Sequence, residues 1–280
     1  MVAVTVPERI AQPRYNIAPG TWITVVKQLS ENEPPFIDDM WWGYLPAWVN
    51  GTGNQPINAR VETVASNGYF KSAFSKHRCL IPANGWYEWI KNSNPKQPHF
   101  LARVDKQPLF FAGIFSDRDD GSLGCAIITE AARGSAVEVH DRMPLILDSG
   151  YLEPWLAPDL TDREAIHNMM KPIDAALIKH WPVSTSVNKP SEGQGEGLIN
   201  PAQHFSFDTK VEALTGQMLY FCITRSSKLR INDRSTRTAR HLHHRLIFRS
   251  HTVASESGLL RRKPSVRMFY ACRNCIPMKF

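Results

Sequence analysis

The sequence lacks any long hydrophobic run and any recognisable targeting segment. No stretch of about 18 apolar residues occurs in its 280 residues, so no transmembrane helix is expected. The first 12 residues do not show the basic and then apolar pattern of a secretory signal peptide. We therefore expect no membrane partner and a cytoplasmic location.

Cysteine is scarce and odd in number, with five residues at positions 79, 125, 222, 272 and 275. An odd count without a secretory signal does not predict a disulfide framework, and Cys79 and Cys125 are expected to be buried, reduced thiols. Cys272 and Cys275 form a lone CxxC, which is a weak zinc signal even with Cys222 and the histidines at 241–244. We expect no metal and no cofactor.

Several motifs that would name a function are missing. The sequence contains no GxGxxG, no Walker A and no HExxH string, which removes the usual signals of dinucleotide, nucleotide and zinc-peptidase sites. It also shows no internal repeat, so a solenoid is not expected.

Charge is distributed unevenly along the chain. Residues 206–280 carry 15 Lys/Arg and 4 Asp/Glu, a net charge of +11, whereas residues 1–205 carry 18 and 22, a net charge of −4. All eight tryptophans lie in the first part. We therefore divide the chain into a folded domain, 1–205, and a basic tail, 206–280, that is poorly structured or foreign to the fold.

The first part predicts an α+β fold with a curled, partly barrel-like antiparallel sheet flanked by a few helices. Short β-branched and aromatic runs are separated by Gly, Pro and Asn, which is typical of such a sheet rather than a βαβ array. The expected strands are 21–28, 37–44, 79–82, 85–90, 100–104, 109–115 and 124–129, with 79–82 paired to 85–90. The expected helices are 62–74, 149–155 and 162–171, the last capped by Asp162 with Ala165, Ile166, Met169 and Met170 on one apolar face.

Five strings place polar residues beside aromatics: RYNIAPG (14–20), WGYLPAW (42–48), INARVET (57–63), ANGWYEW (83–89) and VHDRMP (139–144). Asn58, Arg60 and Glu62 alternate, so on a strand they would share one face, either a salt-bridged surface or the floor of a polar site. Glu88 lies between Tyr87 and Trp89. Partial desolvation there would raise its pKa and suit proton transfer, although an ordinary exposed glutamate fits the same position.

Two further residues carry alternatives. His140 is either a structural histidine or part of a site, since a lone histidine is more often structural. Trp48 is either a core residue or an exposed platform for a base.

Taken together and in this order, the five strings resemble the SOS response-associated peptidase (SRAP) family over residues 14–205. The resemblance implies a protein that binds abasic sites in single-stranded DNA and serves the DNA damage response. Separately, we expect a monomer that is cytoplasmic and associated with the nucleoid. In that family the α-amine of an N-terminal cysteine attacks the sugar aldehyde, and its thiol closes a thiazolidine crosslink.

The same resemblance assigns the site residues. Asn58, Glu88 and His140 match the catalytic positions. There Asn58 would orient the amine, Glu88 would move protons and His140 would hold the opened sugar's hydroxyl. The DNA-binding positions fall on Asn16, Pro19, Trp48, Arg60 and Arg142, with the two arginines as phosphate clamps and Trp48 as a stacking wedge.

One departure bears on the chemistry. Residue 2 is Val2 and only 13 residues precede Arg14, so the family's Cys-Gly-Arg strand is absent from the printed sequence. A start codon placed too late, or a truncated paralogue, would explain it. We expect crosslinking to be deficient and leave enzyme status open between a lyase and a thiol peptidase of this family. Binding to nucleic acid through the basic tail is the non-catalytic alternative.

Overall fold

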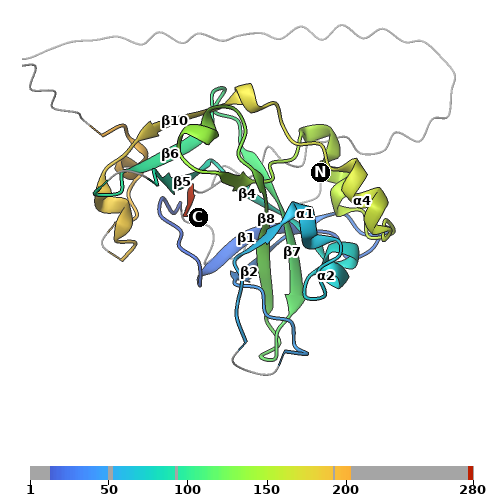
Figure 1. The fold of residues 1–280 in the computed structure, drawn as a ribbon. Helices are drawn as coiled ribbons and strands as arrows, with labels where there is room; N and C mark the ends of the chain where they lie inside the picture. The colour runs from blue at the N-terminus through green and yellow to red at the C-terminus, as the bar shows by residue number, and fades with distance from the viewer. Residues whose placement is uncertain (1–12, 50–52, 92–93, 192, 203–276, 280) are drawn as a thin grey trace, which may run out of the picture. The chain divides into compact units, whose positions relative to one another are not determined.

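The protein is described by a computed structural model over residues 13–49, 53–91, 94–191, 193–202 and 277–279. These residues form two sheets, with short helices packed against the larger one (Figure 1). The larger sheet contains β1 (Trp22–Lys27), β2 (Phe36–Trp42), β3 (Asn58–Arg60), β4 (Arg78–Ala83), β7 (Leu109–Asp117), β8 (Leu123–Ala131) and β9 (Arg142–Pro144). The smaller sheet contains β5 (Gly85–Trp89), β6 (Pro98–Arg103), β10 (Ile178–Pro182) and β11 (Pro277–Lys279), and the α-helices are α1 (Val61–Val64), α2 (Lys71–Lys76), α3 (Leu152–Leu156) and α4 (Arg163–Met169).

Five strands of the larger sheet close into a ring in the order β2, β1, β4, β7, β8 and back to β2. The closing pair, β2 with β8, is parallel, and β3 also joins β8 in parallel; the other pairs of this sheet are antiparallel. The expected α+β fold with a barrel-like sheet is confirmed. The correction is that the sheet is mixed rather than wholly antiparallel.

Both faces of the ring strands are buried, for two different reasons. Successive side chains of a strand point to opposite faces. On β7, Leu109 and Phe111 belong to an apolar cluster that draws on all five ring strands and fills the ring. Phe110 and Ala112 belong to a second cluster that includes Trp155 of α3 and residues of the other helices. The helices therefore cover the outside of the ring.

The smaller sheet has the order β10, β6, β5, β11. A Cβ atom at Gly85 would collide with the carbonyl oxygen of Leu101 and the ring of Phe100, so glycine is required where β5 meets β6. Trp86 packs into the cluster that fills the ring. Glu88, two residues further along β5, faces the same side, and this places a carboxyl group between the two sheets.

The expected pairing of residues 79–82 with 85–90 is wrong. β4 pairs with β1 and β7 in the ring, whereas β5 pairs with β6 in the other sheet. β4 extends to Ala83, so only Asn84 separates the two strands, and a hairpin turn usually needs at least two residues. The chain changes sheets at this point.

The helix expected at 62–74 is two helices, α1 and α2. Between them the side chain of Asn67 accepts a hydrogen bond from the backbone of Tyr69, which replaces helical bonding with a turn. Glu62 consequently lies in α1 and not on the strand face with Asn58.

Asp162 caps α4 as expected, since its carboxylate accepts a hydrogen bond from the backbone N of Ala165 at 2.7 Å. The apolar face is smaller than expected. Ile166 is buried, Met169 and Met170 are half-buried and Ala165 is exposed.

The predicted tail lies outside the described residues, with its cysteines and histidines, except for Pro277–Lys279. These three residues form β11, parallel to β5. The division at residue 205 stays a prediction. In the part of the chain that the structure describes, no helix has the length and hydropathy to span a bilayer.

Candidate functional site

Residues from separate strings line one cavity of about 290 Å³ at the edge of the ring. Asn58, Glu88 and His140 come from three of those strings, and Arg60 and Arg142 lie in the lining with them. The same cavity is completed by Thr129 and Met143. Short sequence motifs that are distant along the chain are therefore neighbours in space.

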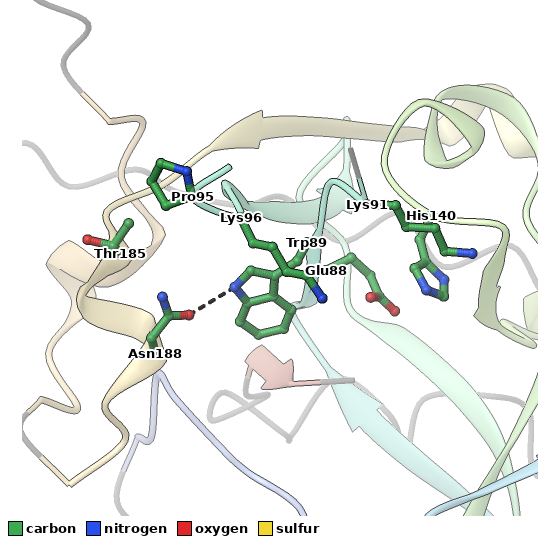
Figure 2. Close-up of a pocket in the computed structure, with 8 residues that line it drawn as sticks. All are labelled: Glu88, Trp89, Lys91, Pro95, Lys96, His140, Thr185 and Asn188. Atoms are coloured by element: carbon green, nitrogen blue, oxygen red, sulfur yellow. Dashed lines mark hydrogen bonds between the residues drawn. The ribbon is translucent and has the colours of Figure 1, made fainter. Parts of the chain in front are cut away.

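A second, larger cavity of about 800 Å³ shares Glu88 and His140 with the first. Trp89, Lys91 and Lys96 are among its lining residues (Figure 2). Pro95, Thr185 and Asn188 complete the lining, and the indole N of Trp89 donates to the Asn188 side chain at 2.9 Å. Because two residues line both cavities, we treat them as one cleft with Glu88 and His140 at its centre.

Glu88 is a carboxyl group held mostly away from water, with 6% of its surface exposed. Burial and, to a lesser extent, the negative charge of Asp141 raise its pKa to about 8 against the opposing effects of the backbone N–H of Trp89 and the charge of Lys91. At neutral pH the carboxyl group is therefore largely protonated. It can donate a proton to a leaving oxygen, which an exposed glutamate at the same pH cannot do.

His140 lies beside the Glu88 carboxyl group in the cleft (Figure 2). The backbone N of Arg142 lies 3.1 Å from His140 Nδ1, and two acceptors, the carbonyl oxygen of Arg142 and the carboxylate of Asp141, each lie 3.2 Å from the same nitrogen, so the tautomer decides whether Nδ1 accepts or donates. When Nδ1 accepts a hydrogen bond in the neutral ring, the proton is on Nε2. In that state Nε2 is a hydrogen-bond donor for an oxygen atom of a ligand.

Asn58 is half-buried on β3, and its Oδ1 atom is buried without a hydrogen-bond partner among the described residues. A buried acceptor without a partner is costly, about 1–3 kcal/mol, and is typical of a position that a ligand completes. An N–H group entering the cleft would satisfy it.

The two arginines differ in what they can bind. Arg142 forms a bidentate ion pair with Glu62, at 2.6 and 3.0 Å, and also donates to the carbonyl oxygen of Thr129. This hydrogen-bonded pairing lowers the pKa of Glu62. The guanidinium of Arg142 is thus occupied, whereas Arg60 is exposed at the rim. In this conformation the side chain of Arg60 is open to solvent, whereas Arg142 would have to exchange or share Glu62 to bind another anion.

Three other sequence-predicted DNA contacts do not line the cleft. Trp48 is 67% exposed and touches the ring of Tyr69 edge-on, with 5.6 Å between ring centroids. Pro19 is half-buried. Asn16 is 1% exposed, and its side-chain N donates to the carbonyl oxygen of Val187. Asn16 therefore ties two loops together, and its side chain is enclosed by the protein.

Sequence reasoning missed several residues of the cleft. Trp89 is the last residue of the GWYEW string and Lys91 follows two residues later, so both could have been found from it. Lys96, Thr185 and Asn188 lie in segments with no distinctive pattern, so no signal in the sequence marks them.

The described thiols lie away from the cleft. Cys79 and Cys125 are fully buried inside the ring, and burial raises the pKa of both. A buried thiol with a raised pKa is a poor nucleophile. Among the described residues no cluster of three or more His, Cys, Asp or Glu side chains could hold a metal ion.

Comparison with known proteins identifies relatives of this fold and sequence. The model of the SOS response associated peptidase (SRAP) family matches residues 2–190. The abasic site processing protein YedK of Escherichia coli is 38% identical over 200 residues, covering 70% of this chain and 86% of that protein. The abasic site processing protein YoqW of Bacillus subtilis is 32% identical, covering 68% and 87%.

A solved structure is similar to this chain in both fold and sequence. The crystal structure of a phage-related protein from Bordetella bronchiseptica is 33% identical and superimposes with a TM-score of 0.52, covering 62% of this chain and 83% of that one. The match to the family model and the similarity to these relatives lead to one conclusion: this chain belongs to the SRAP family.

Proposed function

We propose that the protein processes abasic sites in single-stranded DNA, as a monomer acting on DNA in the cytoplasm. The observation that carries the proposal is the cleft in which Asn58, Glu88 and His140 meet, with a carboxyl group that is protonated at neutral pH. The names of the curated relatives YedK and YoqW point to the same substrate class.

The three residues suit the chemistry of an abasic sugar. In its ring-opened form this sugar carries an aldehyde and a free hydroxyl group. His140 Nε2 donates to the hydroxyl oxygen, and Asn58 Oδ1 accepts from an amine that approaches the aldehyde. Glu88 supplies the proton that turns the aldehyde oxygen into water when the amine and carbon condense.

The surroundings suit a single strand. Trp48 is exposed and offers a flat face on which a base can stack, an interaction worth about 1–3 kcal/mol per base. Arg60 at the rim can contact a phosphate. A single strand can turn its bases outward onto such surfaces, whereas a duplex keeps them stacked inside.

Binding preference tests the proposal. In fluorescence anisotropy, we expect the full chain to bind a single-stranded oligonucleotide with one abasic site more tightly than the matched intact oligonucleotide. A variant whose Lys and Arg residues at 225–249 are replaced by glutamine should keep this preference. Equal affinity for the two oligonucleotides contradicts the proposal, and loss of all binding in the variant favours the basic tail as the binding element.

We also propose that the 280-residue chain does not form a permanent crosslink. A thiazolidine needs an amine and a thiol on one residue, and the described thiols, Cys79 and Cys125, are buried within β4 and β8. We expect no shifted band when the chain is boiled with an abasic oligonucleotide and run on a denaturing gel without reductant. A band that survives would reveal a nucleophilic thiol elsewhere. The same burial of thiols means that nothing in the described residues favours the thiol-peptidase alternative.

A further inference from the structure

The larger cavity of the cleft contains two lysine amines, one held in an ion pair and the other exposed. Lys91 is bound to the carboxylate of Asp141, with 2.6 Å between Nζ and Oδ2. Lys96 lines the same cavity and is exposed, and no ion pair or hydrogen bond joins it to another described residue. Figure 2 shows its amine extending over Trp89 towards Glu88.

We propose that Lys96 is an amine nucleophile of this cleft and forms a reversible imine with the aldehyde of an abasic sugar. The inference rests on the proposed function and adds a residue and a covalent step to it. An amine, a protonated carboxyl group and a histidine that line one cavity are the groups that imine formation requires.

The step balances without an oxidant or reductant. The neutral Nζ of Lys96 forms a bond to the aldehyde carbon, and one of its two protons passes to the carbonyl oxygen, which becomes a hydroxyl group. Glu88, in its acid form, protonates that hydroxyl, which leaves as water as the C=N bond forms. The nitrogen's remaining proton stays on it as an iminium, and addition of water reverses the sequence and restores the lysine.

The difference in pairing explains why Lys96 and not Lys91 is the nucleophile. An ion pair holds a side-chain amine in one geometry and keeps it on its partner. Lys91 is held in this way by Asp141, whose own pKa is lowered by the contact. Lys96 has no such restraint, so its amine is free to reach a sugar bound against Glu88.

Borohydride reduces an imine to a stable secondary amine, so trapping tests the proposal in the full chain. We expect the unmodified chain to give a trapped band with an abasic oligonucleotide, and peptide mapping to place the adduct on Lys96. Lys96→Arg keeps the positive charge but removes the nucleophile, so the band should fall at least about tenfold while anisotropy shows unchanged binding. Lys106→Arg, an exposed lysine outside both cavities, should leave the band unchanged.

Three results would overturn the proposal: no trapped band, a full band from Lys96→Arg, or an adduct mapped to Lys91 or to the α-amine. These differ from failure of the proposed function itself. That failure would show as equal binding of abasic and intact strands by the unmodified chain, before any reductant is added.

Discussion

Replacement of Glu88 by glutamine is expected to slow the formation of the borohydride-trapped adduct by about 100-fold, with little change in binding to the abasic strand. The side chain is similar in size but cannot donate the proton that releases water, and positioned acid–base groups typically contribute about 10²–10⁴-fold. Time courses of trapping, with anisotropy as the binding control, measure both quantities. An unchanged rate would show that Glu88 is not the proton donor.

The same substitution, Glu88→Gln, should slow the reaction but raise the stability of the folded protein at alkaline pH. The pKa of Glu88 is about 8 in the folded protein against an ordinary value of 4.5. Between those values only the unfolded state loses its proton, so the stability of the unmodified protein falls as pH rises and the penalty is complete above pH of about 8. Glutamine does not titrate. Glu88→Gln should therefore be the more stable protein at alkaline pH, by a margin on the order of a few kcal/mol, and the margin should shrink towards acidic pH.

Thermal melting across this pH range checks the sign. The exposed Glu153 provides a matched control, since Glu153→Gln should give no such pH-dependent gain. A Glu88→Gln protein that is less stable than the unmodified protein at every pH would mean that the carboxyl group stabilises the fold. The account instead expects its burial to lower the stability of the folded state.

Replacement of Trp155 by alanine is expected to lower the free energy of unfolding by about 3–5 kcal/mol. Trp155 is fully buried between the ring and the helices, its indole N donates to the carbonyl oxygen of Cys79 at 2.9 Å, and Arg78 lies over its ring. The substitution leaves a cavity and an unsatisfied carbonyl group together.

Urea denaturation followed by circular dichroism measures this loss. Trp48→Ala removes the same side chain from an exposed position and should cost less than about 1 kcal/mol. Similar losses in the two variants would show that the packing of the helices on the ring is not a main source of stability.

The sequence was sufficient for the strands because their burial is local in origin. Runs such as 21–28 and 109–115 are apolar and β-branched, and each is a strand in the structure within two residues. The sequence could not specify which strands pair with one another. All six residues of β4 are buried, so no alternation of polar and apolar residues identified the neighbouring strand, and β4 and β5 were paired wrongly.

The cleft shows the same division between local and non-local information. Asn58, Glu88 and His140 stand out because each is a polar residue in a motif. Their meeting depends on β3 and β9 both pairing with β8 and on β5 lying in the other sheet, which no local pattern predicts. Arg142 was recognised as a cation, but its bidentate pairing with Glu62 depends on α1 beginning directly after β3.

The sequence also did not predict the burial of Asn16 or the presence of two further residues in the cleft. Asn16 is a polar residue of a type that contacts DNA, but its side chain is enclosed. It donates to the carbonyl oxygen of Val187, which lies 171 residues further along the chain. Lys96 and Asn188 belong to segments without periodicity, so only the folded chain reveals that they line one cavity with Glu88.

The central claim is that the cleft around Asn58, Glu88 and His140 is where the abasic sugar binds. The most direct test is the ratio of affinities for abasic and intact single strands, measured by anisotropy in the unmodified chain and in His140→Ala. The account predicts that the ratio falls towards one in the variant while affinity for the intact strand is unchanged, because His140 donates only to the opened sugar. A variant that keeps the full preference for the abasic strand would contradict it.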